Sequence, residues 1–249
     1  MKQINAMIFV TIIIVISFTG CKVGNKAAEG SVDQIFKRAV ELFNDEEYIE
    51  AKNMFDVIKL QYPASQYADD AQFYLAEIAY KREEYIIAAF NYNTVRKYYP
   101  GSEYTKLSLY NSAMAYYELS PPYDRDQEYT RKAIQAFTDF QAYYPDDSLY
   151  TKATEKINEM RDKLAYREYF TANLYNKLES SVAALVYYDI VIKEYNDSKY
   201  IEDSYLQKII LLRKLERWDE AKATVVTFKR LYPKSSLLSD VVAEEKLLK

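Results

Sequence analysis

One short pattern recurs five times along this chain, and it constrains the fold more than any other feature. A tyrosine ends a helical stretch and is followed by proline, or once by asparagine, at Tyr62-Pro63, Tyr99-Pro100, Tyr144-Pro145, Tyr195-Asn196 and Tyr232-Pro233. Proline cannot continue a helix, and the serines that follow most of these sites are good helix N-caps. Each site therefore predicts the end of one helix and the start of the next.

The residues before each stop keep a fixed register. Twelve positions earlier the chain has Ala51, Ala88, Ala133, Ala184 and Ala221, and eight positions earlier it has Phe55, Tyr92, Phe137, Tyr188 and Val225. A second position, one helix earlier, holds Ala39, Ala76, Ala113, Ala172 and Ile209. Small residues let two helices approach closely, and a large neighbour fills the space beside them. This register predicts pairs of packed helices.

The pattern resembles the tetratricopeptide repeat, a helix-turn-helix unit of about 34 residues. The fold is therefore expected to be all-α: an α-solenoid of five tetratricopeptide-like helix pairs plus a C-terminal capping helix after Ser236. The stops lie 37, 45, 51 and 37 residues apart. The two long intervals predict a loop over 120–127 and a long helix from about Tyr150 to Leu178. The expected repeats lie near 32–67, 68–104, 105–149, 150–200 and 201–236, within one domain over 32–249.

The N-terminus carries an address signal. Residues 1–20 combine an early lysine, an apolar run from Ile8 to Ile16, and small residues just before Cys21. The run is too short to cross a bilayer core of about 30 Å with ease, so it favours a cleavable signal peptide over an uncleaved membrane helix. The segment resembles a bacterial lipobox, with Phe18 where leucine is usual. Cys21, the only cysteine, is the expected attachment point for diacylglycerol and an N-acyl chain, followed by a flexible leader over 21–31.

Composition excludes several classes of function. The chain has no histidine, so catalytic triads and histidine-ligated metal sites are excluded. It has only four glycines, which argues against phosphate-binding loops, and we expect no metal and no cofactor apart from the lipid. Removing Lys2 with the signal changes the net charge from −4 to −5, which argues against nucleic-acid binding. We therefore expect that the protein is not an enzyme.

The concave face of a solenoid is its usual binding surface, and the first helices of the pairs line it. Superimposing the first three pairs gives one aromatic row of Phe36, Phe73 and Tyr110, and a second of Phe43, Tyr80 and Tyr117. Val40, Glu77 and Met114 run between the rows. These residues predict either a groove for an aromatic-ended or extended peptide, or rings that only pack against neighbouring helices. A one-residue error in register would rotate a ring by about 100°, so both interpretations stay open.

A second candidate site is the loop that contains Pro121, Pro122 and the sequence Asp124-Arg125-Asp126. The prolines stiffen it, and its charges are available to a partner. The alternative interpretation is a solvated loop whose acidic residues cap the helix that starts near Glu128.

The lipobox, the five repeats and the long fourth first helix together resemble the BamD (ComL) family of outer membrane assembly lipoproteins. The most specific part is Asp124-Arg125-Asp126, followed by Arg161-Asp162-Lys163-Leu164-Ala165. The resemblance implies a non-enzymatic scaffold, lipid-anchored to the periplasmic face of the outer membrane. It also implies two kinds of partner: nascent β-barrel proteins at the first three repeats, and the periplasmic (POTRA) domains of a BamA-type barrel protein at the last two. Further assembly lipoproteins are additional candidate partners.

Two residues depart from the family pattern: Asn196 replaces the proline of the fourth stop, and Tyr187 stands where the family usually has arginine. Because Tyr187 falls on the expected docking side, no partner-contact residue is assigned in the last two repeats. The alternative function is that of another envelope tetratricopeptide-repeat lipoprotein, one that organises cell-wall enzymes or bridges the envelope.

Overall fold

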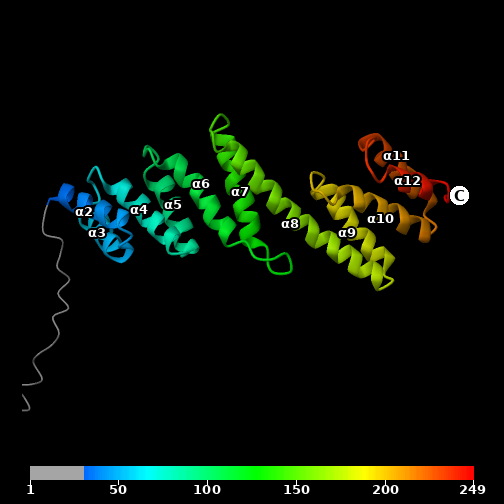
Figure 1. Cartoon of the computed structure of the whole chain (residues 1–249), viewed down its shortest axis with the longest axis horizontal. Coiled ribbons are helices and arrows are strands. Elements are labelled where there is room, and N and C mark those ends of the chain that lie inside the picture. Colours follow the sequence, from blue (N-terminus) through cyan, green and yellow to red (C-terminus); the bar gives the residue numbers. More distant parts are fainter. Residues whose placement is uncertain (1–30) are drawn as a thin grey trace, which may run out of the picture. The chain divides into compact units, whose positions relative to one another are not determined.

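The computed structural model describes residues 31–249 (Figure 1). Cys21, the expected signal peptide and all but the last residue of the expected leader lie outside the described residues. Within the described part every regular element is a helix, and none of these helices is long and apolar enough to cross a membrane. The chain divides into two compact units, residues 1–63 and 64–249.

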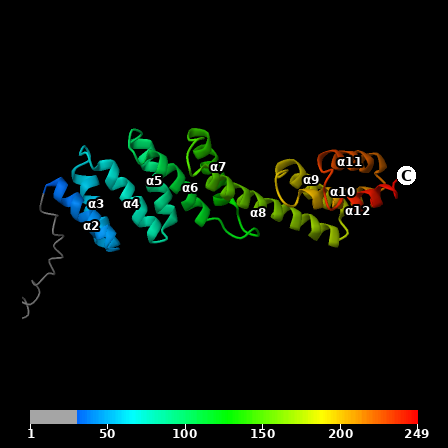
Figure 2. The ribbon, with the colours of Figure 1, turned by 45° about the horizontal axis from the view of Figure 1, so that its top comes forward.

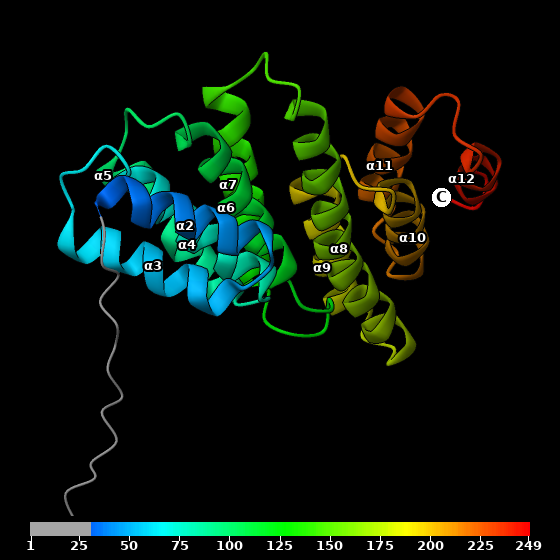
Figure 3. The same ribbon diagram turned by 60° about the vertical axis from the view of Figure 1, so that its left-hand side comes forward.

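The described part of the first unit is one helix pair, α2 (Val32–Asn44) and α3 (Tyr48–Gln61), which lie side by side in Figure 3. Ser31 caps α2: its side chain accepts a hydrogen bond from the Gln34 backbone N–H, and the Gln34 side chain accepts one from the Ser31 N–H, a capping box. Ala39 and Ala51 are fully buried, as the register requires. These local signals mark the start of α2 and the close contact between the two helices.

The second unit holds four more helix pairs and a final helix (Figures 1 and 2). The helices are α4 (Ala68–Lys81), α5 (Tyr85–Tyr98), α6 (Thr105–Glu118), α7 (Glu128–Tyr143), α8 (Tyr150–Lys177), α9 (Ser181–Glu194), α10 (Ile201–Lys214), α11 (Trp218–Leu231) and α12 (Leu238–Glu245). Each packs against the next along the chain from α4 to α12. The expected all-α fold of five helix pairs followed by a C-terminal helix is confirmed.

The register residues form the contacts between helices. Every small residue of both register positions, and every large residue eight positions before a stop, has an exposed fraction of 0%. In the second unit they fall into four hydrophobic clusters that follow one another along the helices. The recurring pattern in the sequence is therefore the pattern of the core.

In four of the five pairs the turn between the two helices contains a glutamate with positive φ. These residues are Glu46, Glu83, Glu179 and Glu216, at 62°, 60°, 58° and 58°. This left-handed conformation usually favours glycine because a Cβ atom is crowded there. The third pair has the loop over 120–127 at the same place instead.

Candidate binding surfaces around the long helix

The rings of the first aromatic row pack against other aromatic rings of the same unit. In the first unit Phe36 lies edge-to-face against Phe55, with ring centroids 6.1 Å apart. In the second unit Phe73 is only 6% exposed and stacks on Tyr104 at 4.2 Å. Tyr110 lies edge-to-face against Phe137 and Phe140 at 5.5 and 5.3 Å. For Phe73 the structure therefore favours the packing interpretation, because little of the ring is accessible to a ligand.

The second row is half-buried, and hydrogen bonds hold its two tyrosines. The Tyr80 hydroxyl donates to Glu118 at 3.4 Å, and its ring meets Tyr85 at 5.3 Å. The Tyr117 hydroxyl donates to Glu159 of α8 at 2.6 Å, with the Lys156 ammonium 3.9 Å from its ring centroid. In the first unit Phe43 lies against Tyr48 at 5.8 Å.

Glu77, the acidic residue between the two aromatic rows, has a structural role. The Tyr92 hydroxyl, buried on α5, donates to the Glu77 carboxylate at 2.5 Å, and the Asn111 side-chain amide of α6 donates to the same oxygen at 2.8 Å. Burial, followed by the charge of Glu77, raises the pKa of Tyr92 well above its usual range. Glu77 therefore joins three consecutive helices and is already engaged.

The same pairing recurs further along the chain. The Tyr188 hydroxyl donates to the Asn173 side chain at 2.9 Å, in the positions that correspond to Tyr92 and Glu77. In the third pair the tyrosine position holds Phe137, which has no hydroxyl, and the partner position holds the apolar Met114. In these two pairs a polar residue accepts the hydrogen bond of the buried tyrosine, and in the third pair an apolar residue stands at the partner position of the phenylalanine. Neither the Tyr92 nor the Tyr188 hydroxyl is therefore left without an acceptor.

This pairing predicts that two damaging substitutions compensate each other. Glu77→Met leaves the buried Tyr92 hydroxyl without its acceptor, and should lower the free energy of unfolding by about 1–3 kcal/mol. Adding Tyr92→Phe recreates the Met114–Phe137 combination of the third pair and should restore much of the loss. Urea unfolding of the wild type, both single variants and the double variant measures the coupling. Strictly additive effects would contradict the pairing.

The loop over 120–127 is held from inside by a buried glutamine. Gln127 has an exposed fraction of 0%, and its side-chain amide donates to the carbonyls of Pro122 and Arg125 at 2.7 and 3.0 Å. The Thr130 hydroxyl donates to the Gln127 oxygen at 2.7 Å. The loop is therefore a fixed platform.

The charged residues of the loop lie on the outside of this platform. The Asp126 carboxylate accepts a hydrogen bond from the Glu128 backbone N–H at 2.8 Å, the capping role expected for this loop. Asp124 and Arg125 are exposed, and within the described residues neither side chain makes a hydrogen bond or ion pair. These two charges therefore remain available to a partner.

Three consecutive residues of α8 tie two distant loops to the middle of this helix. The Lys163 ammonium donates to Ser120 at 2.5 Å and to the Pro121 carbonyl at 3.1 Å, and burial lowers its pKa. Arg161 makes a bidentate ion pair with Asp197 at 2.6 and 2.7 Å, and the Asp162 carboxylate accepts the Lys199 backbone N–H at 3.0 Å. The Arg161 hydrogen bonds lower the pKa of Asp197.

The first departure, Asn196, lies in the loop that Arg161 and Asp162 hold, whereas the other four stops of this chain carry proline.

The second departure also has a local contact. Tyr187 of α9 stacks on Tyr175 of α8, with ring centroids 5.4 Å apart and planes 10° from parallel. Tyr187 is therefore held by an aromatic contact between the two helices of the fourth pair.

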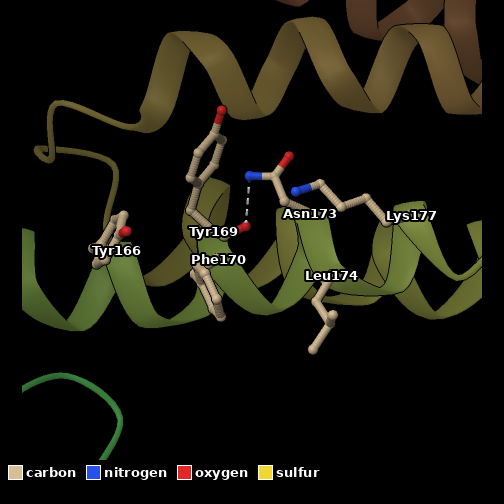
Figure 4. A pocket seen from close by; sticks show the side chains of 6 residues that line it. All are labelled: Tyr166, Tyr169, Phe170, Asn173, Leu174 and Lys177. Carbon is tan, nitrogen blue, oxygen red and sulfur yellow. Dashed lines mark hydrogen bonds between the residues drawn. The ribbon is translucent and has the colours of Figure 1, made fainter.

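One surface was missed by the sequence analysis. The C-terminal half of α8 carries a hollow of about 280 Å³ lined by Tyr166, Tyr169, Phe170, Asn173, Leu174 and Lys177 (Figure 4). Phe170 and Leu174 are 43% and 46% exposed. The four-residue spacing of Tyr166, Phe170, Leu174 and Leu178 was the signal that could have revealed it.

The fold and these surfaces define a tetratricopeptide-like repeat scaffold. Within residues 31–249, no cluster of three or more carboxylate, histidine or cysteine side chains is placed to hold a metal ion. The model of the YfiO family, described as outer membrane lipoprotein, matches residues 28–226, and the chain belongs to this family. The expected resemblance is confirmed, and so is the expectation that the protein is not an enzyme.

Named relatives agree with the family match. The outer membrane protein assembly factor BamD of Neisseria gonorrhoeae is 22% identical over 219 residues, which cover 84% of this chain and 82% of the relative. The protein of the same name in Rickettsia prowazekii is 21% identical over 240 residues, or 96% and 94% of the two chains. A solved structure of a thermophilic TPR protein from Thermus thermophilus aligns with a TM-score of 0.38 and 18% identity, covering 88% of this chain and 100% of that one.

Proposed function

We propose that this chain is a lipid-anchored scaffold of the machinery that assembles β-barrel proteins in the outer membrane. It faces the periplasm, held by lipid on Cys21. It binds nascent barrel proteins through its first three repeats and the POTRA domains of a BamA-type barrel protein through its last two.

The observation that carries this proposal is the family match over 28–226 together with relatives named as assembly factors. Local structure supports it. The part of α8 that ties the third repeat to the fourth, Arg161-Asp162-Lys163, lies in the stretch through which the resemblance to the family continues after the Asp124-Arg125-Asp126 loop. A scaffold that carries one partner at each end needs such a connection between its halves.

Co-purification tests the proposal directly. The chain carries a C-terminal tag, the membrane is extracted in mild detergent, and the proteins bound to the purified chain are identified. A barrel protein with POTRA domains should be recovered in near-stoichiometric amount. Its absence, or recovery of cell-wall enzymes instead, would reject the assembly role and favour the alternative envelope lipoprotein.

The lipid anchor is tested in the same cells. Cys21→Ala should move the chain from the membrane fraction to the soluble fraction, since a stably anchored protein depends on its acyl chains. The circular dichroism spectrum should be unchanged, because the cost is one of local concentration. A Cys21→Ala chain that stays membrane-bound in cells depleted of its barrel partner would contradict anchoring through this cysteine.

A further inference from the structure

The C-terminal half of α8 leaves open a face that other first helices bury. Two positions after the small register residue, α4, α6 and α10 carry Ile78, Ala115 and Leu211, which are 1%, 0% and 0% exposed. The corresponding residue of α8 is Leu174, and it is 46% exposed.

The cause is the length of α8. In its neighbours a preceding helix covers this position: α5 packs on Ala115, and α9 packs on Leu211. The preceding helix α7 instead meets the first half of α8, at Ala153 and Met160. The second half runs on beyond α7. The ring of Tyr123 lies 4.7 Å from Tyr166 and 5.4 Å from Phe170, and the ring of Tyr200 lies 5.4 Å from Tyr166.

An uncovered face of a repeat array is normally polar, because it meets water. The first pair obeys this rule: its residue at the same register position is the exposed Glu41. The face of α8 breaks the rule, since Phe170, Leu174 and Leu178 are 43%, 46% and 65% exposed. An apolar face at a position that elsewhere receives a helix indicates a helix supplied by another molecule.

The charged residues beside this face indicate which charge the bound helix would carry. Between residues 163 and 178 the cations are Lys163, Arg167 and Lys177, and the only acidic residue is Glu168. At about 100° per residue, Arg167 and Lys177 fall on the side of the apolar stripe and Glu168 falls outside it. Neither Arg167 nor Lys177 makes an ion pair within residues 31–249, and Lys177 is one of the six residues that line the hollow (Figure 4). The two unpaired charges that residues 163–178 place on the side of the apolar stripe are therefore both positive.

We propose that the hollow and stripe on the C-terminal half of α8 bind an acidic amphipathic helix of a partner protein, in the place that the second helix of a preceding pair would occupy. Large residues spaced by four form a ridge that fits the groove of another helix. The unpaired cations attract acidic residues on the flanks of the docked helix. This surface does not depend on the proposed function, because it follows from the register and burial of α8 alone.

Synthetic helical peptides test the proposal on the purified full chain in mild detergent. Three probes share one composition of leucine and alanine: an acidic helix with a leucine stripe and glutamate flanks, the same helix with lysine flanks, and the acidic helix with its leucines scrambled. Fluorescence anisotropy should show the acidic striped helix binding at least tenfold more tightly than either other probe. Equal affinity for all three would overturn the proposal.

Variants locate the binding on α8. Leu174→Arg should weaken the acidic striped helix at least tenfold, and Lys177→Glu should shift preference toward the lysine-flanked helix. Val226→Arg on α11 is the matched control, since Val226 is 64% exposed and lies elsewhere, and it should change nothing. Circular dichroism confirms that each variant stays folded, and unchanged binding by a folded Leu174→Arg would overturn the proposal. So would a dimer of the chain, seen by sedimentation, that Leu174→Arg dissociates, because the occupant would then be a second copy.

Discussion

Phe73→Ala is expected to lower the free energy of unfolding by about 3–5 kcal/mol, the usual cost of removing a buried phenylalanine ring. The ring is 6% exposed, stacks on Tyr104 and lies 5.9 Å from Tyr92. Its loss leaves a cavity where α4, α5 and the start of α6 meet. Thermal and urea unfolding followed by circular dichroism measure the effect.

Phe90→Ala on α5 provides the matched control, because Phe90 is 67% exposed. It should change stability by no more than about 0.5 kcal/mol, as surface substitutions do. The comparison also separates packing from ligand binding at Phe73. A Phe73→Ala chain as stable as the wild type would mean that the ring serves a ligand and not the core.

Gln127→Met is expected to release the loop over 120–127. Methionine has nearly the same size, but it removes the side-chain donor of the Pro122 and Arg125 carbonyls and the glutamine acceptor of the Thr130 hydroxyl. The Pro122 carbonyl keeps only the Arg125 backbone N–H, and Thr130 keeps only Ser120. Leaving such groups unsatisfied costs about 1–3 kcal/mol each where they stay buried. Limited trypsin digestion should cut after Arg125 at least tenfold faster than in the wild type.

The matched control for the loop is Gln135→Met on α7, whose exposed side-chain amide donates only to Asp139. Its digestion rate should equal that of the wild type. If Gln127→Met is cut no faster than this control, the loop does not depend on the buried amide for its order. Lys163, which holds the loop from α8, would then be its main support.

The repeat register was sufficient to predict the fold. A small residue and a large residue at fixed distances before each stop are the pattern of helices packed in pairs. The buried Ala88 and Tyr92 show this packing directly. The long helix was also predictable, since the 51-residue interval leaves no other stop between Pro145 and Asn196. Its observed bounds, Tyr150–Lys177, lie within one residue of the prediction.

The exposure of individual rings was not predictable. Phe73 and Tyr80 both lie on α4, yet one is buried and the other half-buried, because burial depends on the crossing of neighbouring helices and not on spacing along one helix. The role of Glu77 was hidden for the same reason: its partners Tyr92 and Asn111 come from two other helices. The open face of α8 was missed because it requires knowing where α7 ends against α8.

The length of α8 also bears on how the second unit unfolds. Repeat arrays ordinarily lose their units one after another, because neighbouring units interact only across an interface. Here the hydrophobic clusters of the third and fourth pairs share one uninterrupted helix, with Ala153 and Met160 in one cluster and Ala172 in the next. Opening the boundary between these pairs requires breaking the hydrogen bonds of α8 itself. The middle of the second unit should therefore melt as one cooperative block, and partial unfolding should begin at its ends.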